Sequence, residues 1–492
     1  MWIIHQLWNY LQLSRRIYSH YKDYSDTHVH NEASIDDILE SVCKCGSVCI
    51  KLCQWIIPSL ETLYIDREQF NTLDYEKPRW LRKLYKVYEN CPEHSLHYTY
   101  DKYEQVFHKP FIQDYRIIDC CGSGSIGQVY KIQSIHTQEY YAMKILHPNI
   151  DRDIRLFERL YRYIHGALCW WKGVHTLIPL CIPDFITSFR EQSDFINEAN
   201  NLLKLKHTYK SNPYLVFPEI CILSKEILLM KYVEGHVFDD FKDESLFVKT
   251  KIFMMFYLFT RTMTLVHNFN HGDLHMSNWK VKRADNPLGY EIILYDFGFC
   301  WEMDHSRRYL ARKAVDLFEN MDTHSNKKDS DIFSEIMYDG IEHSHIHDTQ
   351  ELQELQDSIN AYIQSSPYIG QCKGTLRINP TIIYKVIHEY CYQHHLYMTS
   401  ELLQFVIIYT QLHLLCSKYG MASLKGDSTR DNVYKERYID CLNYCKTYDV
   451  YPEYVEYIHQ KLTEVSISRH SVFECSNNKE YHSFKSLALM QP

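Results

Sequence analysis

The stretch that decides the fold is His271-Gly-Asp-Leu-His-Met-Ser-Asn278, which is followed by Tyr295-Asp-Phe-Gly298. The first segment places Asp273 five residues before Asn278, in the pattern H-x-D-x-x-x-x-N. A carboxylate at the first position can orient or deprotonate an attacking hydroxyl group or water, and an amide oxygen at the second can hold a metal ion. Asp296 follows an apolar run, and its carboxylate is the predicted main ligand of Mg²⁺.

Upstream of this pair, Gly122-Ser-Gly-Ser-Ile-Gly-Gln-Val129 fits the pattern G-x-G-x-x-G-x-V between two predicted strands, Tyr115–Asp119 and Gly127–Ile132. Glycines there let backbone N–H groups close over nucleotide phosphates without a Cβ in the way. A strand rather than a helix follows, which favours a kinase-type loop over a Rossmann loop, although a glycine-rich hairpin alone is an equal alternative. The residues expected to contact the nucleotide are Gly122, Ser123, Gly124, Ser125, Gly127, Val129, Lys144 and Met230.

Lys144 lies in Ala142-Met-Lys144, on a predicted strand that spans Tyr140–Leu146. A lysine inside an apolar strand is costly unless an anion meets it, and nucleotide phosphates together with a helix carboxylate would supply that anion. The candidate carboxylate is Glu198, in the predicted helix that contains Asp194-Phe-Ile-Asn-Glu-Ala-Asn-Asn201. A snorkelling lysine and a solvated glutamate are the alternatives for the two residues taken one at a time.

These five motifs occur in the chain order of a two-lobed kinase, each on the type of element that its chemistry needs. We predict an α+β, protein-kinase-like fold. Residues 1–110 would form an N-terminal helical extension, 111–232 a smaller lobe with inserted helices, and 233–492 a helical lobe that carries the catalytic and metal-binding loops. The expected cofactors are ATP and Mg²⁺. Catalysis would rest on Asp273, Lys144 and Glu198, while Asn278 and Asp296 would hold the metal.

The same residues are similar to the motifs of the UbiB family, the aarF-domain or ADCK-like atypical kinases. The family's nucleotide loop, S-I-G-Q-V-H, resembles Ser125–Tyr130, and its V-A-V-K-V-Q-H-P-G-V strand resembles Tyr141–Ile150. Its motifs D-F-x-x-E-A-x-N, M-E-Y-V-E-G and H-A-D-x-H-P-G-N resemble Asp194–Asn201, Leu229–Gly235 and His271–Asn278. The resemblance covers roughly residues 40–320.

The family's K-x-G-Q motif resembles Lys51-Leu-Cys-Gln54. The resemblance implies that this helix folds over the active site and blocks ordinary protein substrates, so Lys51 and Gln54 would be regulatory. Cys53 replaces the motif's glycine, which bears on how closely the helix can pack. Gly122 and Gly124 replace the alanines common in the family, as in its glycine-containing subset, which implies nucleotide handling closer to that of an ordinary kinase.

The leading hypothesis is an ATP- and Mg²⁺-dependent atypical kinase or ATPase. By resemblance, its phosphate acceptor would be water or a lipid-like, isoprenoid-quinone-related molecule at a membrane surface. The first alternative is a Ser/Thr protein kinase, which the glycine loop favours and the missing A-P-E motif after Asp296 disfavours. The second is a nucleotide-binding regulatory pseudokinase, against which the complete set of catalytic residues argues.

Composition narrows the partners and the compartment. The 492-residue chain has a net charge of −9 and no run of five Lys or Arg, so we expect no nucleic-acid partner. Its 17 irregularly spaced cysteines are typical of reduced thiols in a reducing, intracellular compartment. The apolar stretches Trp2–Leu13 and Ala167–Phe185 are interrupted by polar groups and predict no membrane span. No secretory signal is evident, and a transit peptide is a minor alternative.

Local patterns carry further expectations. Ser34–Asp37 resembles a capping box before a helix that would run to about Trp55 and end at Pro58. Cys45, Cys49 and Cys53, like His343, His345 and His347, could hold a metal ion, but buried small residues and a polar loop are the favoured interpretations. The pair Trp170-Trp171 favours packing over a membrane contact. The remaining predicted strands are Leu215–Ile222, Ile227–Val233 and a hairpin of Trp279–Val281 with Ile292–Tyr295.

Overall fold

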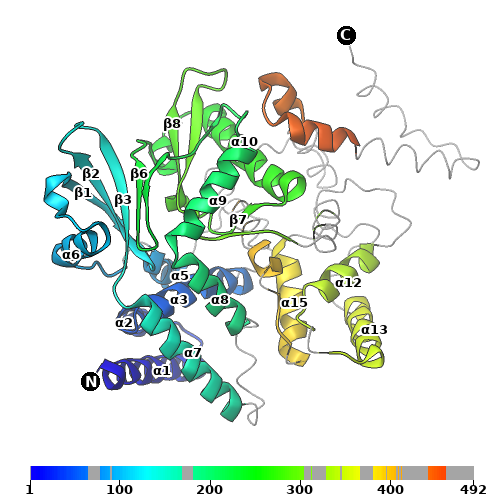
Figure 1. Ribbon diagram of the computed structural model, residues 1–492. Helices are drawn as coiled ribbons and strands as arrows, with labels where there is room; N and C mark the ends of the chain where they lie inside the picture. The colour runs from blue at the N-terminus through cyan, green and yellow to red at the C-terminus, as the bar shows by residue number, and fades with distance from the viewer. Residues whose placement is uncertain are drawn as a thin grey trace, which may run out of the picture.

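The computed structural model (Figure 1) describes residues 2–64, 78–88, 91–168, 181–303, 329–343, 346–365, 380–394, 396–399, 401–405 and 442–460, with positions 308, 312, 408 and 412. A smaller lobe built on an antiparallel sheet and a larger, mainly helical lobe give it the predicted α+β architecture. Helices from the N-terminal part of the chain lie against both. Trp170, Trp171 and His345 are outside the described residues.

The smaller lobe contains a five-stranded sheet in the order β1-β2-β3-β6-β5, with every neighbouring pair antiparallel. Its strands are β1 Tyr115–Ser123, β2 Gly127–Ser134, β3 Tyr140–Leu146, β5 Ile220–Leu223 and β6 Ile227–Lys231. Side chains alternate between the two faces of a strand. One face packs against Tyr103 of helix α6 (Leu96–Phe107) and Phe111 of the short helix η2 (Phe111–Gln113) through Tyr130, Ile132, Met143, Ile145, Ile227 and Leu229.

Helix α9 (Phe195–Thr208) packs against β5 and β6 from the other side of the sheet. Asp194 caps it by accepting a hydrogen bond from the N–H of Ile196 at 3.0 Å, which satisfies a donor that the first helical turn leaves open. Helices α7 (Ile150–Leu168) and α8 (Ile182–Gln192) are inserted between β3 and α9. This insertion accounts for the long interval between Lys144 and Glu198.

The larger lobe carries a three-stranded sheet in the order β4-β9-β8. The predicted hairpin is present as β8 (Trp279–Arg283) and β9 (Tyr290–Leu294), which pair antiparallel. Helix α10 (Leu246–Arg261) packs against β9 and continues into a π-helical turn. The remaining elements of this lobe are η3 Phe238–Phe241, η4 Thr262–His267, β7 Asn270–His271, η5 Met276–Asn278, β10 Cys300–Trp301, α12 Asp329–Asp339, α13 Thr349–Ser365 and α15 Pro380–His394.

The prediction of one strand over Leu215–Ile222 is wrong, because this stretch forms two strands in different lobes. Strand β4 (Leu215–Val216) pairs parallel with β9 of the larger lobe, whereas Ile220–Leu223 is β5 of the smaller lobe. Pro218 lies between them. Proline has no N–H to donate to a neighbouring strand, so a continuous strand cannot pass through a central position at this residue.

The N-terminal extension is formed by α1 (Trp2–Thr27), α2 (Glu32–Lys44), α3 (Ser47–Tyr64), α5 (Arg79–Tyr85) and η1 (Lys86–Tyr88). The predicted capping box at Ser34–Asp37 is wrong. Helix α2 starts earlier, because the side chain of Asn31 accepts hydrogen bonds from the N–H groups of Ala33 and Ser34. The predicted single helix is also divided at Gly46, whose φ of +84° favours glycine.

Pro58 does not end the helix as predicted, since α3 continues to Tyr64. A proline inside a helix removes one N–H donor and leaves the carbonyl four residues earlier without its usual partner. That carbonyl belongs to Gln54, and the hydroxyl of Tyr88 donates a hydrogen bond to it. A side chain from η1 thus replaces the missing backbone donor and ties η1 to α3.

The cysteines within the described ranges are free thiols. Cys45 and Cys49 are buried in the core of the extension, and Cys53 packs against that core. Among the described residues, no group of three or more His, Cys, Asp or Glu side chains could hold a metal ion. None of the described helices combines the length and the apolar character that a membrane crossing requires.

Candidate active site

Lys144, Glu198 and Asp296 form a charged cluster between the two lobes. The Nζ atom of Lys144 lies 3.0 and 2.8 Å from the two carboxylate oxygens of Glu198 and 3.0 Å from Oδ1 of Asp296. The side chains of Lys144 and Glu198 are 8% and 1% exposed. Met143 and Ile145 belong to the core under α6. Because side chains alternate along a strand, Lys144 must point to the opposite face, where α9 carries Glu198.

The charges in this cluster set its protonation. Burial favours a neutral lysine, but the carboxylates of Asp296 and Glu198 outweigh it, and the pKa of Lys144 is raised. Burial also opposes ionisation of Asp296, but Lys144 and Lys51 outweigh it and hold the pKa of Asp296 well below its usual range. Burial raises the pKa of Glu198, with Lys144 opposing the shift. Asp296 is therefore a stable anion, and its side chain is 45% exposed.

Hydrogen bonds join His271–Asn278, which we call the catalytic segment, to the end of β9. Nδ1 of His271 accepts from the N–H of Asp273 at 3.3 Å, so Nε2 carries the ring proton and lies 3.2 Å from the carbonyl oxygen of Tyr295. The side-chain Nδ2 of Asn278 donates to the carbonyl of Asp273 at 2.8 Å, and the N–H of Tyr295 donates to the carbonyl of Asn278 at 2.9 Å. These bonds place Asp273, Asn278 and Asp296 close together from two separate segments.

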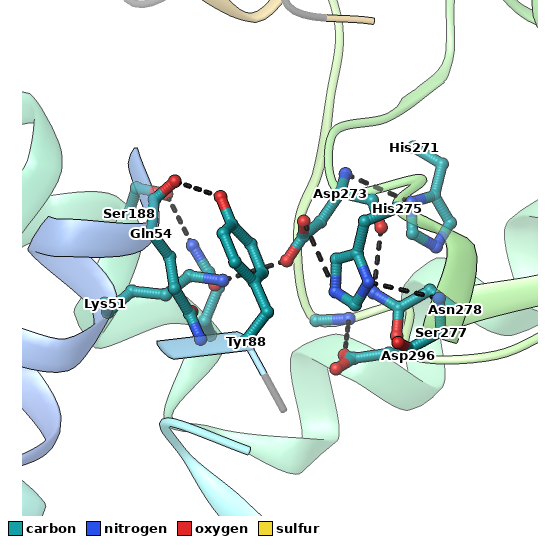
Figure 2. Close-up of polar contacts among 12 residues, drawn as sticks. Lys51, Gln54, Tyr88, Ser188, His271, Asp273, His275, Ser277, Asn278 and Asp296 are labelled. Carbon is teal, nitrogen blue, oxygen red and sulfur yellow. Dashed lines mark hydrogen bonds and ion pairs between the residues drawn. The ribbon is translucent and has the colours of Figure 1, made fainter. Parts of the chain in front are cut away.

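Lys51 contacts the catalytic segment directly. Its Nζ donates to Oδ2 of Asp273 at 3.0 Å, and the lysine side chain is almost fully buried (Figure 2). Nε2 of His275 lies 3.7 Å from the other oxygen of Asp273. Burial opposes ionisation of Asp273, but Lys51 and His275 outweigh it, and the pKa of Asp273 is lowered. The predicted catalytic carboxylate is thus paired with a cation from the N-terminal extension.

Gln54 and Tyr88 lie beside Lys51 near the catalytic segment (Figure 2). Figure 2 shows Tyr88 between α3 and the catalytic segment, and its ring lies 5.4 Å from that of His275. The side chain of Gln54 donates to the carbonyl of Val87 at 3.2 Å. We call Lys51, Gln54 and Tyr88 the extension cap. It forms with cysteine in place of the motif's glycine, because Cys53 packs toward the core of the extension. Sequence reasoning does not identify Tyr88. The one usable signal is Pro58, because a proline inside a helix leaves the carbonyl of Gln54 in need of a donor from elsewhere.

The glycine loop between β1 and β2 is tied to the extension by two histidines. The N–H of Gly124 donates to the carbonyl of Gly127 at 2.9 Å, which closes the turn. Nε2 of His147 lies 3.0 Å from the carbonyl of Gly124 and 3.3 Å from the hydroxyl of Ser123. The Nδ1 atoms of His147 and His94 are 2.8 Å apart, so one of them carries the shared proton. Burial lowers the pKa of both rings.

Other residues predicted to contact nucleotide lie in this loop or on strands of the same sheet. Val129 is opposite Lys144 in the β2–β3 register, and Met230 is opposite Ala142 in the β3–β6 register. Ser125 and Met230 are buried. Beyond β6, the hydroxyl of Tyr295 donates to the carbonyl of Val233 at 2.9 Å, a contact that sequence reasoning does not identify.

The three glycines of the loop differ in what they require. A Cβ atom at Gly127 would lie 2.7 Å from the carbonyl oxygen of Ile145 and 3.3 Å from the ring of Phe195. At Gly124 the nearest atom would be 3.6 Å away, which is an ordinary contact. Gly122 has open space around it but a φ of +154°, which other residues rarely adopt. Gly127 is therefore required by strand packing and Gly122 by backbone conformation.

The Gly127→Ala variant is expected to lose roughly 1–3 kcal/mol of unfolding free energy, because β2 and β3 must separate to admit the new methyl group. Gly124→Ala is the matched control in the same loop and should stay within about 0.5 kcal/mol of the original protein. Urea unfolding of the three proteins measures both values. Equal losses for the two variants would contradict this account of Gly127.

Comparison with known proteins identifies the family. Residues 86–330, about half of the chain, match the model of the ABC1 atypical kinase-like domain. The chain belongs to the ABC1 atypical kinase-like family. This membership confirms both the resemblance to UbiB and aarF-domain kinases and the kinase-like fold. The matched range contains β1 to β10, and thus the charged cluster, the glycine loop and the catalytic segment.

Curated relatives of this ABC1 chain carry kinase or ABC1 family names. The "Probable serine/threonine-protein kinase abkC" of Dictyostelium discoideum is 27% identical over 51% of this chain and 35% of its own length. The "ABC1 family protein MCP2 homolog" of Schizosaccharomyces pombe is 24% identical over 58% of this chain and 53% of its own. The "Probable protein kinase UbiB" of Cronobacter sakazakii is 24% identical over 40% of this chain and 37% of its own length. The chain therefore spans between about a third and a half of these relatives.

Among solved structures, one is titled as a complex of Rv3197 with erythromycin from Mycobacterium tuberculosis. The two sequences are 16% identical. The superposition includes 73% of this ABC1 chain and 90% of the other chain, with a TM-score of 0.40.

Proposed function

We propose that this ABC1 chain is an ATP- and Mg²⁺-dependent phosphotransferase or ATPase. The observation that carries the proposal is the cluster of Lys144, Glu198 and Asp296 beside Asp273 and Asn278. A buried lysine with two carboxylates is expensive to maintain, and replacing such groups by apolar ones often stabilises a protein. A role in binding a charged ligand explains why the cluster is retained.

Each group in the site has a distinct role in the proposal. Lys144 contacts the α- and β-phosphates, and Glu198 holds the lysine in position. The backbone N–H groups of residues 122–127 close over the phosphates. Asp273 accepts the proton of the attacking hydroxyl group or water, which general-base catalysis accelerates by roughly 10²- to 10⁴-fold.

The donor atoms around Asp296 and Asn278 fit Mg²⁺, which prefers oxygen ligands. Within the described residues, the hydrogen bonds at Asp296 use Oδ1, so Oδ2 is the atom that would coordinate the ion. The amide nitrogen of Asn278 is engaged with the carbonyl of Asp273, which turns its oxygen toward a ligand. Mg²⁺ bound there would neutralise charge on the β- and γ-phosphates.

The extension cap supports a small or lipid-like acceptor over a folded protein substrate. Lys51 is bonded to Asp273, and Tyr88 lies against His275, so an extended peptide would have to displace both side chains to reach the carboxylate. Water, a small alcohol or the hydroxyl end of an isoprenoid-like molecule requires less room. In this proposal Lys51 and Gln54 regulate access to Asp273.

Release of γ-phosphate from ATP tests the assignment of Asp296. Metal ligation contributes several kcal/mol to the transition state, and each ~1.4 kcal/mol is tenfold in rate, so Asp296→Asn should be slower by roughly a hundredfold or more. Asp285→Asn, the same chemical change at an exposed turn of the β8–β9 hairpin, is the control and should keep the original rate. Equal rates for all three proteins would refute the catalytic assignment. Tight ATP binding without turnover would indicate a regulatory pseudokinase.

A further inference from the structure

Helix α1 packs against the protein partly through polar side chains. Gln6 and Asn9 are only 6% and 8% exposed. Their amide nitrogens donate to the carbonyls of Cys45 and Lys44, at 2.6 and 2.9 Å, which are among the carbonyls left open at the end of α2. Further along, Arg16 donates to the hydroxyl of Ser41 at 2.7 Å. The buried side of α1 therefore combines specific hydrogen bonds with the packing of Tyr10 and Leu13 against the core of the extension.

The opposite side of α1 exposes large apolar side chains. Ile4 is 74% exposed and Trp8 55%, and Leu7, Leu11 and Tyr18 are exposed as well. Residues three or four positions apart lie on the same side of a helix, so these side chains form one continuous stripe. A surface helix ordinarily places such a stripe against the core. The additional stripe on the outward side of α1 marks an interaction surface, because contiguous exposed apolar patches are rare on soluble proteins.

Basic side chains border the stripe. Arg15 and Lys22 are exposed and continue it by helical spacing, and residues 2–22 contain no Asp or Glu. Helices α1 and α7 lie side by side (Figure 1). The guanidinium of Arg152 stacks 3.8 Å from the ring of Trp2, and Tyr10 contacts Phe157. The surface of α7 adds three exposed arginines at helical spacing, Arg155, Arg159 and Arg162, of which Arg162 lies 4.0 Å from Glu158. Together α1 and α7 carry seven Arg or Lys and five Asp or Glu side chains, so the two helices have a net charge of +2 although the whole chain has −9.

We propose that the outward side of α1, together with the exposed arginines of α7, is a docking surface for a bilayer that contains anionic lipids. An apolar stripe with Trp8, bordered by Arg and Lys, is the pattern of helices that lie in the membrane interface. Anionic headgroups complement the basic border. A second copy of the chain fits less well, because pairing two such stripes would bring Arg15 against an apolar partner and set like charges against each other.

The test is co-flotation of the full chain with vesicles of phosphatidylcholine alone, or with roughly a third phosphatidylserine. The original protein should bind the anionic vesicles. Ile4→Glu with Trp8→Glu should weaken that binding at least about tenfold, because the stripe can no longer enter the interface. Arg155→Glu with Arg159→Glu should weaken it by roughly tenfold on anionic vesicles and leave any binding to neutral vesicles unchanged.

The matched control is Ile112→Glu, which changes an equally exposed isoleucine of the smaller lobe and should bind as the original protein does. All replaced side chains are exposed, so the variants should share one melting temperature. Absence of vesicle binding by the original protein, or retained binding by the Ile4/Trp8 variant, would overturn the proposal. So would an original dimer that becomes monomeric in that variant and never binds vesicles. The proposal is independent of ATP use, since γ-phosphate release is a separate measurement on the same proteins.

Discussion

Replacing Lys144 with methionine is expected to lower the free energy of unfolding by about 3–5 kcal/mol above neutral pH. The methionine fills most of the lysine's volume but carries no charge. Glu198 is then left in the core without its counter-ion, since both of its oxygens bond to Lys144. Removing one partner of a buried ion pair costs more than removing both, because the remaining charge is not compensated.

The pH dependence of this loss has a definite sign. Burial already raises the pKa of Glu198, and without Lys144 nothing in the pair opposes that shift. A carboxyl group whose pKa is higher in the folded state stabilises the fold when it is protonated, and that contribution is lost as pH rises through the folded pKa. Lys144→Met should therefore be least destabilised in mildly acidic solution and most destabilised above neutral pH.

Chemical unfolding across pH measures this prediction. Lys144→Met with Glu198→Leu should recover part of the loss, because no isolated charge is left in the core. Lys231→Met is the matched control on the neighbouring strand. Its lysine pairs with Glu219 at the surface, where an ion pair contributes about 0–1 kcal/mol. A double variant as unstable as Lys144→Met, or a loss independent of pH, would contradict the argument.

Replacing Lys51 with alanine is expected to increase phosphate transfer to peptide or to the chain itself by roughly 10- to 100-fold. In the original protein an acceptor must first separate Lys51 from Asp273, which are 3.0 Å apart. A hydrogen bond between charged groups contributes about 1.5–3 kcal/mol, and each 1.4 kcal/mol corresponds to about a factor of ten. The variant removes that competition and leaves Asp273 free to accept a proton.

Transfer of labelled γ-phosphate measures this effect, with Lys83→Ala as the control. Lys83 belongs to the same extension but pairs with Asp36 at its surface, so its removal should leave transfer unchanged. If Lys51→Ala instead abolishes ATP use, Lys51 belongs to the catalytic machinery and does not restrain it. If transfer to a generic peptide becomes efficient, the protein-kinase alternative gains support over a small or lipid-like acceptor.

Motif spacing was sufficient to assemble most of the site. Asp273 and Asn278 are close in sequence, and strand alternation determines the side to which Lys144 points. Glu198 required more, because 54 positions separate it from Lys144 and a solvated helical glutamate was an open alternative; the family resemblance accounted for the long interval. The two-lobed architecture could be predicted because each motif lies next to a recognisable strand or helix, and such patterns are local in the sequence.

Contacts between distant segments could not be predicted in this way. His94 meets His147, and Tyr88 meets Gln54, through side chains that no local pattern pairs. Helix boundaries failed for a related reason. The sequence around Pro58 reads as a helix end until another segment supplies the donor that proline lacks. Such compensation depends on tertiary structure, so single-sequence rules do not detect it.

The pairing of β4 with β9 limits how the two lobes can move. The chain enters the larger lobe at Tyr209, whose ring packs against those of Phe259 and His267, and returns only after Val216. Any opening of the lobes must therefore pivot near this edge, and the glycine loop at the far edge would travel furthest. Glu198 lies on α9, which packs against β5 and β6 of the lobe that carries Lys144, so the two residues would move together. We expect the Lys144–Glu198 pair to persist while the lobes open and close. Movement of α9 that separates this pair is therefore not expected to switch the site on and off.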